Sequence, residues 1–223
     1  MRTLYHHPIC PFSRKVRVVL AEKKLEFALE VEPFWERRAE FVALNPSGQV
    51  PVLVEEGGSV FADSTAISEY LDEVHREPPL LPSEPEARAE VRRLVRWFDG
   101  KFFREVTVCL VGEKVNKRLA GGHAEPDSRH IRSGYAAIHE HLDYIGWLTE
   151  RRTWLAGSHY TLADIAAAAQ VSCIDYLGDV PWDRHPGAKD WYARVKSRPA
   201  FRALLADHLP GMPPPKHYAD LDF

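Results

Sequence analysis

Apolar residues along the first 76 positions follow two alternating periods. Phe27, Leu29 and Val31 are separated by single residues, which is the spacing of a half-buried strand, and Thr3-Leu4-Tyr5 predicts a shorter strand before it. Between these two strands, apolar side chains recur at helical spacing over residues 11–24. The chain is therefore expected to begin with a strand, a helix and a second strand.

The rest of this region predicts a short helix, a hairpin and a longer helix. These elements are expected at residues 35–43, at 52–54 with 60–61, and from 63 or 64 to 74. Asn45-Pro46-Ser47-Gly48 stops the short helix and Gly57-Gly58 turns the hairpin. Asp63 or Ser64 caps the last helix. This β-α-β-α-β-β-α order predicts an α/β domain in which helices pack on a small sheet.

A proline-rich stretch separates this region from a helical one. Residues 77–85 hold Pro78, Pro79, Pro82 and Pro85, which favour extended chain and predict a domain linker. No later stretch has strong strand character, and five helical patterns follow. They cover residues 86–119, 129–150, 161–177, 186–197 and 200–207. We expect domains at 1–76 and 86–209, the second an all-helical bundle, and a terminal tail at 210–223.

Two of these helices carry more specific predictions. Thr161 and Asp164 have the spacing of a capping box with aspartate in place of glutamate, which is a folding signal rather than a chemical one. In the first long helix, Phe103 is expected either to line a substrate pocket or subunit interface or to belong to an aromatic core. In the same helix, four apolar residues are expected to face inward and three arginines outward. They are Leu94, Val95, Phe98 and Phe102, and Arg92, Arg93 and Arg96.

Composition narrows the class of protein. The 223 residues are 45% hydrophobic and 27% charged, with a net charge of −3, as in an ordinary soluble globular protein without a basic field for nucleic acid. No apolar run approaches the ~20 residues of a membrane span, and the N-terminus lacks the apolar region of a secretory signal. Three widely spaced cysteines argue against a disulfide framework and for a cytoplasmic location. The 11 histidines form no metal-ligand constellation, so no metal site is expected.

Cys10 is the strongest candidate for chemistry. Cys10-Pro11-Phe12-Ser13 opens a predicted helix, where unpaired N–H groups and the positive end of the helix dipole favour a thiolate. The alternative is that Cys10 is a small, half-buried residue with a packing role only. Ser13 lies one helical turn further on and is expected to support or cap, with Cys10 as the reacting group.

Several motifs in one order resemble the glutathione transferase superfamily over nearly the whole chain. Besides the Cys10 segment they are Leu44 to Leu53, Asp63-Ser64-Thr65-Ala66-Ile67, Leu162-Ala163-Asp164-Ile165 and Ser197-Arg198-Pro199-Ala200-Phe201. The resemblance implies an N-terminal thioredoxin-like domain, a C-terminal helical domain and usually a homodimer. It also implies glutathione as co-substrate and a small electrophile or disulfide as the second substrate.

The resemblance assigns binding roles to five residues. A cis bond between Val50 and Pro51 would expose the backbone of Val50 to the cysteinyl unit of glutathione. Ser64, at a helix start, would hold the γ-glutamyl carboxylate, and Asp63 would meet its amino group, although the family more often has glutamate there. Gln49 would contact the glycyl end. Two of these assignments have plainer alternatives: an ordinary trans proline at a strand start for Val50-Pro51, and a helix N-cap for Asp63-Ser64.

A bacterial subgroup of this superfamily, which includes an FtsZ-localised cell-division protein, is similar in the stretch Trp35-Glu36-Arg37-Arg38 and in the tail. Gly211-Met212-Pro213-Pro214-Pro215 is expected to be extended, and Lys216 to Phe223 adds aromatic and acidic residues. Such a tail suits partner binding or docking on a second subunit; a disordered terminus is the alternative. Two functions thus remain: a glutathione-dependent transferase, which we favour, and an adaptor of the same fold that binds FtsZ through its tail.

Overall fold

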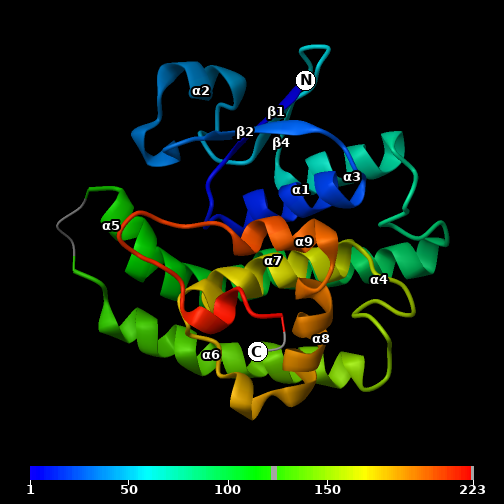
Figure 1. The fold of residues 1–223 in the computed structure, drawn as a ribbon, viewed down its shortest axis with the longest axis vertical. Helices are drawn as coiled ribbons and strands as arrows, with labels where there is room; N and C mark the ends of the chain where they lie inside the picture. The colour runs from blue at the N-terminus through cyan, green and yellow to red at the C-terminus, as the bar shows by residue number, and fades with distance from the viewer. Residues whose placement is uncertain (122–124, 222–223) are drawn as a thin grey trace.

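A four-stranded mixed sheet forms the centre of the N-terminal part of the molecule. In this computed structural model, which describes residues 1–121 and 125–221, the strands lie in the order β2-β1-β3-β4 (Figure 1). Strand β1 runs parallel to β2 and antiparallel to β3, and β3 pairs with β4 as the predicted hairpin. The strands are β1 (Arg2–His6), β2 (Phe27–Val31), β3 (Val52–Val54) and β4 (Val60–Ala62).

Three helices cover the two faces of this sheet. They are α1 (Pro11–Glu22), α2 (Ala39–Leu44) and α3 (Ser64–Val74), so the predicted order of strands and helices is confirmed. Because side chains alternate along a strand, Leu4 belongs to the main core with α1 and α3, whereas Tyr5 packs against Phe41 of α2 on the other face.

The helix expected at residues 35–43 is broken in two. A 3₁₀ turn, η1 (Phe34–Glu36), is followed by Arg37 in the left-handed conformation with φ of +48° before α2 begins. The side chain of the next residue, Arg38, pairs with the buried carboxylate of Glu32. This ion pair anchors the break in the helix to the end of β2.

The C-terminal part is entirely helical among the residues described. One continuous helical rod covers the predicted range 86–119, with its middle, η2, in π-type geometry. The helices are α4 (Pro85–Arg96), η2 (Trp97–Asn116), α5 (Lys117–Leu119), α6 (Ser128–Thr149), α7 (Leu162–Tyr176), η3 (Trp182–Arg184), α8 (Pro186–Lys196), α9 (Pro199–Leu205) and η4 (Lys216–Tyr218). Along the rod, Leu94, Val95, Phe98 and Phe102 are buried as predicted.

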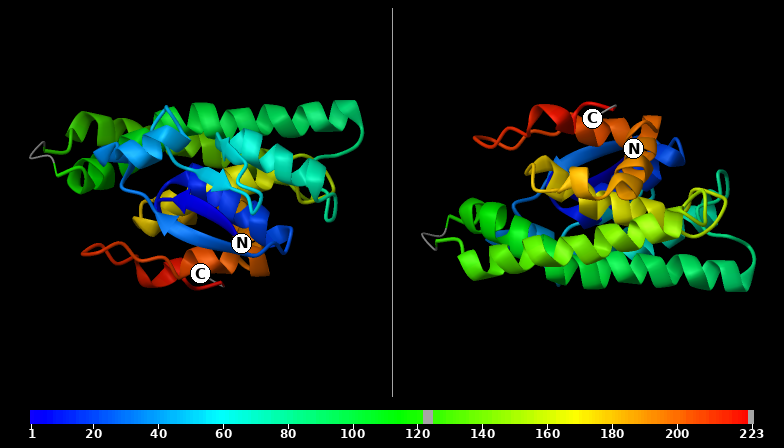
Figure 2. Two further views of the ribbon diagram at one scale, coloured as in Figure 1. Left: turned by 90° about the horizontal axis from the view of Figure 1, so that it is seen from above. Right: turned by 90° about the horizontal axis from the view of Figure 1, so that it is seen from below.

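Helix α7 is the axis of this part. Every one of its residues is buried, and α1 of the N-terminal part packs directly on it (Figure 2). The predicted capping box forms at its start: the Thr161 hydroxyl accepts from the backbone N–H of Ala163, and the Asp164 carboxylate accepts from that of Thr161. None of the described helices is both long and apolar enough to cross a lipid bilayer.

The tail folds back onto its own chain. Met212 accepts a hydrogen bond at its backbone carbonyl from the hydroxyl of Tyr176 in α7, and Tyr218 is fully buried. The tail is therefore anchored to its own chain through Tyr218, whose hydroxyl donates to the carbonyl of Leu204 in α9, although several other residues of the tail are exposed. Asp222 and Phe223 of the predicted interaction segment lie outside the described residues. So does Gly122, which together with Gly121 is expected from the sequence to separate the first two helices of the C-terminal part.

Candidate functional site

A cleft lies where the first domain meets the η2 helix. Its volume is about 690 Å³. Its lining includes all five residues that were expected to bind a ligand: Gln49, Val50, Pro51, Asp63 and Ser64. These residues come from two separate segments, the loop before β3 and the start of α3, which the sheet brings together. The two segments thus form one wall with two different kinds of contact.

The first kind of contact is backbone. The Val50–Pro51 peptide bond is cis, directly before β3. The loop that leads into it is held by Asn45, whose side-chain amide donates to the carbonyl of Gln49 at 2.8 Å and whose side-chain oxygen accepts from the N–H of Ser47. The Gln49 side chain is exposed at the cleft. This loop therefore presents the main chain of Val50 in a set position.

The second kind of contact is a helix terminus. Asp63 is the N-cap of α3, with φ of +72°, and one of its oxygens, Oδ1, accepts from the backbone N–H groups of Thr65 and Ala66. Ser64 is the first helical residue and is buried, with its edge on the cleft. Asp63 rather than Ser64 is thus the cap. The other oxygen of Asp63 and the positive end of α3 can each meet a charged ligand group.

A second, smaller cavity of about 160 Å³ adjoins the cleft. Phe12, Gln49, Val50 and Phe103 line both. The rest of its lining is mostly apolar: His7, Ile9, Cys10, Pro11, Phe34, Thr107, Val108, Val111, Gly112 and Asn116. Of the two roles considered for Phe103, lining a pocket is the one that the structure shows; its ring packs on Phe12 of α1. A polar cleft and an apolar cavity therefore share one wall.

Cys10, the N-cap of α1, lines the apolar cavity and contacts Val50 of the shared wall. Its thiol is half-buried and donates to the backbone carbonyl of Val50, with a sulfur–oxygen distance of 3.9 Å. Burial raises the pKa of Cys10, although the hydroxyl and N–H of Ser13 and the N–H of Phe12 act in the opposite direction. The largest effect on Cys10 thus favours the protonated thiol, whereas the helix N-terminus on which the expectation of a thiolate was based acts against it.

Ser13 does not reach either cavity. It is fully buried on the inner side of α1, and its hydroxyl accepts from the backbone N–H of His7 at 3.3 Å. Its hydroxyl and backbone N–H still act on the Cys10 thiol, where hydrogen bonding from Ser13 works to lower the pKa of Cys10. The position of Ser13 agrees with the supporting role expected for it beside Cys10.

Comparison with known proteins decides the family. Residues 9–74 match the N-terminal domain model of glutathione S-transferases, and residues 132–199 match the C-terminal domain model. The crystal structure of a glutathione S-transferase from Rhodospirillum rubrum F11 is 58% identical and superimposes with a TM-score of 0.98, each chain covering 100% of the other. The chain belongs to the glutathione S-transferase family.

Two other relatives of this glutathione S-transferase family member are named for different properties. FtsZ-localized protein A of Caulobacter vibrioides is 50% identical over 100% of this chain and 98% of its own. A glutathione S-transferase from Methylobacillus flagellatus, solved with glutathione bound, is 28% identical, with a TM-score of 0.75 over 92% of this chain and 98% of the other. The family therefore includes a glutathione S-transferase solved with glutathione bound and a protein named for its localisation with FtsZ.

The wall of the cleft opposite Val50 and Ser64 was not predicted from the sequence of this glutathione S-transferase family member. Arg96 and Asp99 of the α4–η2 rod line it, with Thr65 of α3. Arg96 was expected to belong to a solvated or dimer-facing stripe. Asp99 accepts from the buried ammonium of Lys15, which also donates to the Thr65 hydroxyl at 3.2 Å. The spacing of apolar residues predicts which face of a helix is polar, but it does not predict that this face lies opposite another domain and lines a cleft.

The described histidines do not form a metal site. Within residues 1–121 and 125–221, no group of three or more His, Cys, Asp or Glu side chains is arranged to hold a metal ion. His6 and His7, next to the Cys10 turn, are both buried, and burial lowers the pKa of each to about 4. Both imidazoles are therefore neutral near pH 7.

Proposed function

We propose that this protein binds glutathione in the cleft and transfers it to or from a small electrophile or disulfide. The observation that carries the proposal is the place of Cys10, which lines the apolar cavity and contacts Val50 of the wall that this cavity shares with the polar cleft. A tripeptide thiol lying along Val50 in the cleft would bring its sulfur to this wall. The apolar cavity would then receive the second substrate.

The contacts available in the cleft suit the three parts of glutathione. The main chain of Val50 would pair with the cysteinyl unit as an added strand. The α3 N-terminus at Ser64 would hold the γ-glutamyl carboxylate, and the second oxygen of Asp63 its ammonium group. The exposed amide of Gln49 would meet the glycyl end. Each of these groups already lines the cleft.

The chemistry at Cys10 depends on its protonation. A neutral Cys10 can donate its S–H to the sulfur of bound glutathione and so favour the ligand thiolate, which then attacks an electrophile in the apolar cavity. With a disulfide substrate, the Cys10 thiolate attacks one sulfur, the other sulfur leaves as a thiolate, and a mixed disulfide forms. The raised pKa of Cys10 favours the donor role near neutral pH.

Calorimetric titration with glutathione tests the proposal. We expect binding of the wild-type chain in the millimolar range or tighter, weakened by Ser64→Ala. Ser59→Ala, an exposed serine in the β3–β4 turn and not among the residues that line the cleft, is the matched control and should bind like wild type. Absence of heat at millimolar glutathione would overturn the transferase proposal.

A second candidate is an adaptor that binds the cell-division protein FtsZ. The observation in its favour is the 50% identity to FtsZ-localized protein A over the whole chain. Co-sedimentation with polymerised FtsZ from the same organism tests it. Deleting residues 219–223 would remove the end of the tail while keeping the buried Tyr218; retained sedimentation of that variant would exclude the tail end as the binding segment, and loss of it would support the tail.

A further inference from the structure

The turn that carries Cys10 is held from beneath by side chains of distant elements. Arg14, fully buried in α1, donates from Nε to the backbone carbonyl of Pro8 at 2.6 Å. The thiol of Cys173, in α7, donates to the next carbonyl, that of Ile9, at 3.2 Å. The two carbonyls directly before Cys10 are therefore both fixed by donors from the protein interior.

Arg14 in turn is held by the tail. Its Nη1 donates to the hydroxyl of Tyr218 at 3.0 Å and to that of Ser172 at 2.9 Å. The Tyr218 hydroxyl donates its own hydrogen bond to the backbone carbonyl of Leu204 at 3.1 Å. Tyr218 is 204 positions away from Arg14 in sequence, yet both side chains are fully buried and adjoin.

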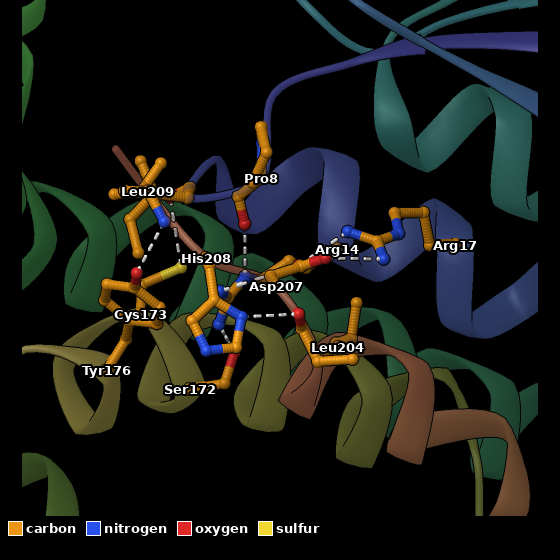
Figure 3. Close-up of polar contacts among 12 residues, drawn as sticks. Pro8, Arg14, Arg17, Ser172, Cys173, Tyr176, Leu204, Asp207, His208 and Leu209 are labelled. Carbon is orange, nitrogen blue, oxygen red and sulfur yellow. Dashed lines mark hydrogen bonds and ion pairs between the residues drawn. The ribbon is translucent and has the colours of Figure 1, made fainter. Parts of the chain in front are cut away.

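An acidic residue offers Arg14 a competing partner. Asp207, just after α9, accepts two hydrogen bonds from Arg17 and lies 3.8 Å from Nη2 of Arg14 (Figure 3). Figure 3 shows Arg14 between Pro8, Ser172 and Asp207. Without the Tyr218 hydroxyl, the guanidinium has one acceptor fewer on the tail side and a carboxylate within reach on the other. The Tyr218 hydroxyl is thus one of the groups that hold the Arg14 side chain where its Nε meets the Pro8 carbonyl.

We propose that Tyr218, acting through Arg14, is a positioning residue that sets the turn carrying Cys10 and couples the tail to the cleft. The coupling crosses from the last described helical turn of the chain to the first helix. It rests on the proposed function only for its effect on glutathione binding; its effect on the Cys10 thiol is independent of any ligand.

Alkylation of Cys10 by iodoacetamide, followed by mass spectrometry of the peptide that contains it, tests the coupling in the unliganded protein. Tyr218→Phe keeps the buried ring and removes the hydroxyl. A loosened turn admits water to the thiol, so we expect Cys10 to react about threefold faster at pH 7.5 and the pH profile of the rate to move to lower pH by about 0.5. A residue that served stability alone would leave this profile unchanged.

Tyr160→Phe is the matched control. Tyr160 is also buried, and its hydroxyl has no hydrogen-bond partner among the described residues, so its loss should leave the Cys10 profile as in wild type. Ser172→Ala removes the other acceptor of Arg14 Nη1 and should shift the profile in the same direction as Tyr218→Phe. It decides the question if Tyr218→Phe does not fold.

Two results separate this coupling from the proposed function. If wild type binds no glutathione but Tyr218→Phe shifts the Cys10 profile, the transferase proposal fails and the coupling stands. If wild type binds glutathione and the profiles of Tyr218→Phe and Ser172→Ala both coincide with those of wild type and Tyr160→Phe, the coupling is overturned.

Discussion

The thiol of Cys10 faces the backbone carbonyl of Val50, the residue before the cis proline, at a sulfur–oxygen distance of 3.9 Å. Forty positions of sequence separate the two residues, and the sheet brings them together at the wall between the cleft and the apolar cavity. A thiol can donate to this carbonyl, whereas a thiolate would be repelled by it. The contact and the burial of Cys10 both favour the protonated form.

The first prediction follows from this environment. Because burial raises its pKa, Cys10 should be alkylated with a pH midpoint above that of an unperturbed thiol, about 8.5. Stopped-flow or quenched alkylation between pH 6 and 10, with glutathione as the free-thiol reference, measures it. A midpoint below that of the reference would show that the helix N-terminus outweighs burial.

The second prediction concerns acid stability. Burial, with a further contribution from Arg17, lowers the pKa of His6 to about 4, so the unfolded chain binds a proton at higher pH than the native one. Stability from this group is therefore complete above about pH 6.5 and falls as the pH drops toward 4. From these values the loss at pH 5 is on the order of 2 kcal/mol.

Urea unfolding at pH 7 and pH 5 checks this loss. His6→Leu cannot titrate and should lose less stability between the two pH values than wild type does. Asp164 works in the opposite direction, since burial raises its pKa to about 6, but it is present in both proteins and cancels in the comparison. Equal losses in wild type and variant would contradict the assignment to His6.

The third prediction compares two glycines of α6. A Cβ on Gly134 would lie 2.8 Å from the Cβ of Cys109 and 2.9 Å from Leu110 of the η2 helix, whereas a Cβ on Gly146 would meet nothing within 4 Å. Gly134→Ala should therefore destabilise the protein by about 1–3 kcal/mol. Gly146→Ala should be neutral or stabilise it by up to about 1 kcal/mol, because alanine favours a helix. Thermal or urea unfolding of both variants decides; equal effects would contradict the close packing at Gly134.

The fourth prediction separates two roles of Asp63. Its side chain caps α3, and its backbone adopts φ of +72°, which glycine tolerates and other residues rarely do. Asp63→Ala loses the cap and keeps the unfavourable conformation, so it should cost about 0.5–2 kcal/mol or more. Asp63→Gly loses the cap but relieves the backbone, and should unfold at a higher urea concentration than Asp63→Ala. The reverse order would show that the backbone conformation is not strained.

Local patterns were sufficient to predict most elements of the fold. The strands at β1 to β4, the long helices and the Thr161–Asp164 capping box appeared where apolar spacing and capping residues placed them. The one broken element, at residues 35–43, depends on the ion pair between Arg38 and Glu32 and on a left-handed Arg37, neither of which changes the apolar pattern.

The site was predicted in part. One wall of the cleft consists of two short sequence motifs, Gln49–Pro51 and Asp63–Ser64. Motifs of this kind can be recognised in the sequence without knowledge of the fold. The opposite wall, with Arg96 and Asp99, was missed because it comes from a helix whose outward face has an ordinary charged pattern. Ser13, which the sequence placed beside Cys10 in a supporting role, is buried and lines neither cavity, since one turn of helix separates a lining residue from a buried one.

Secondary structure, helix caps and family membership could be predicted from the sequence, because each depends on residues within a few positions of one another. The raised pKa of Cys10, the burial of Tyr218 and its contact with Arg14 came from packing between residues far apart along the chain. Loss of water at a group depends on everything that surrounds it, and no local window contains that information. For this reason the position of the Cys10 thiol at the start of a helix could be predicted from the sequence, whereas the direction of its pKa shift depends on the tertiary structure.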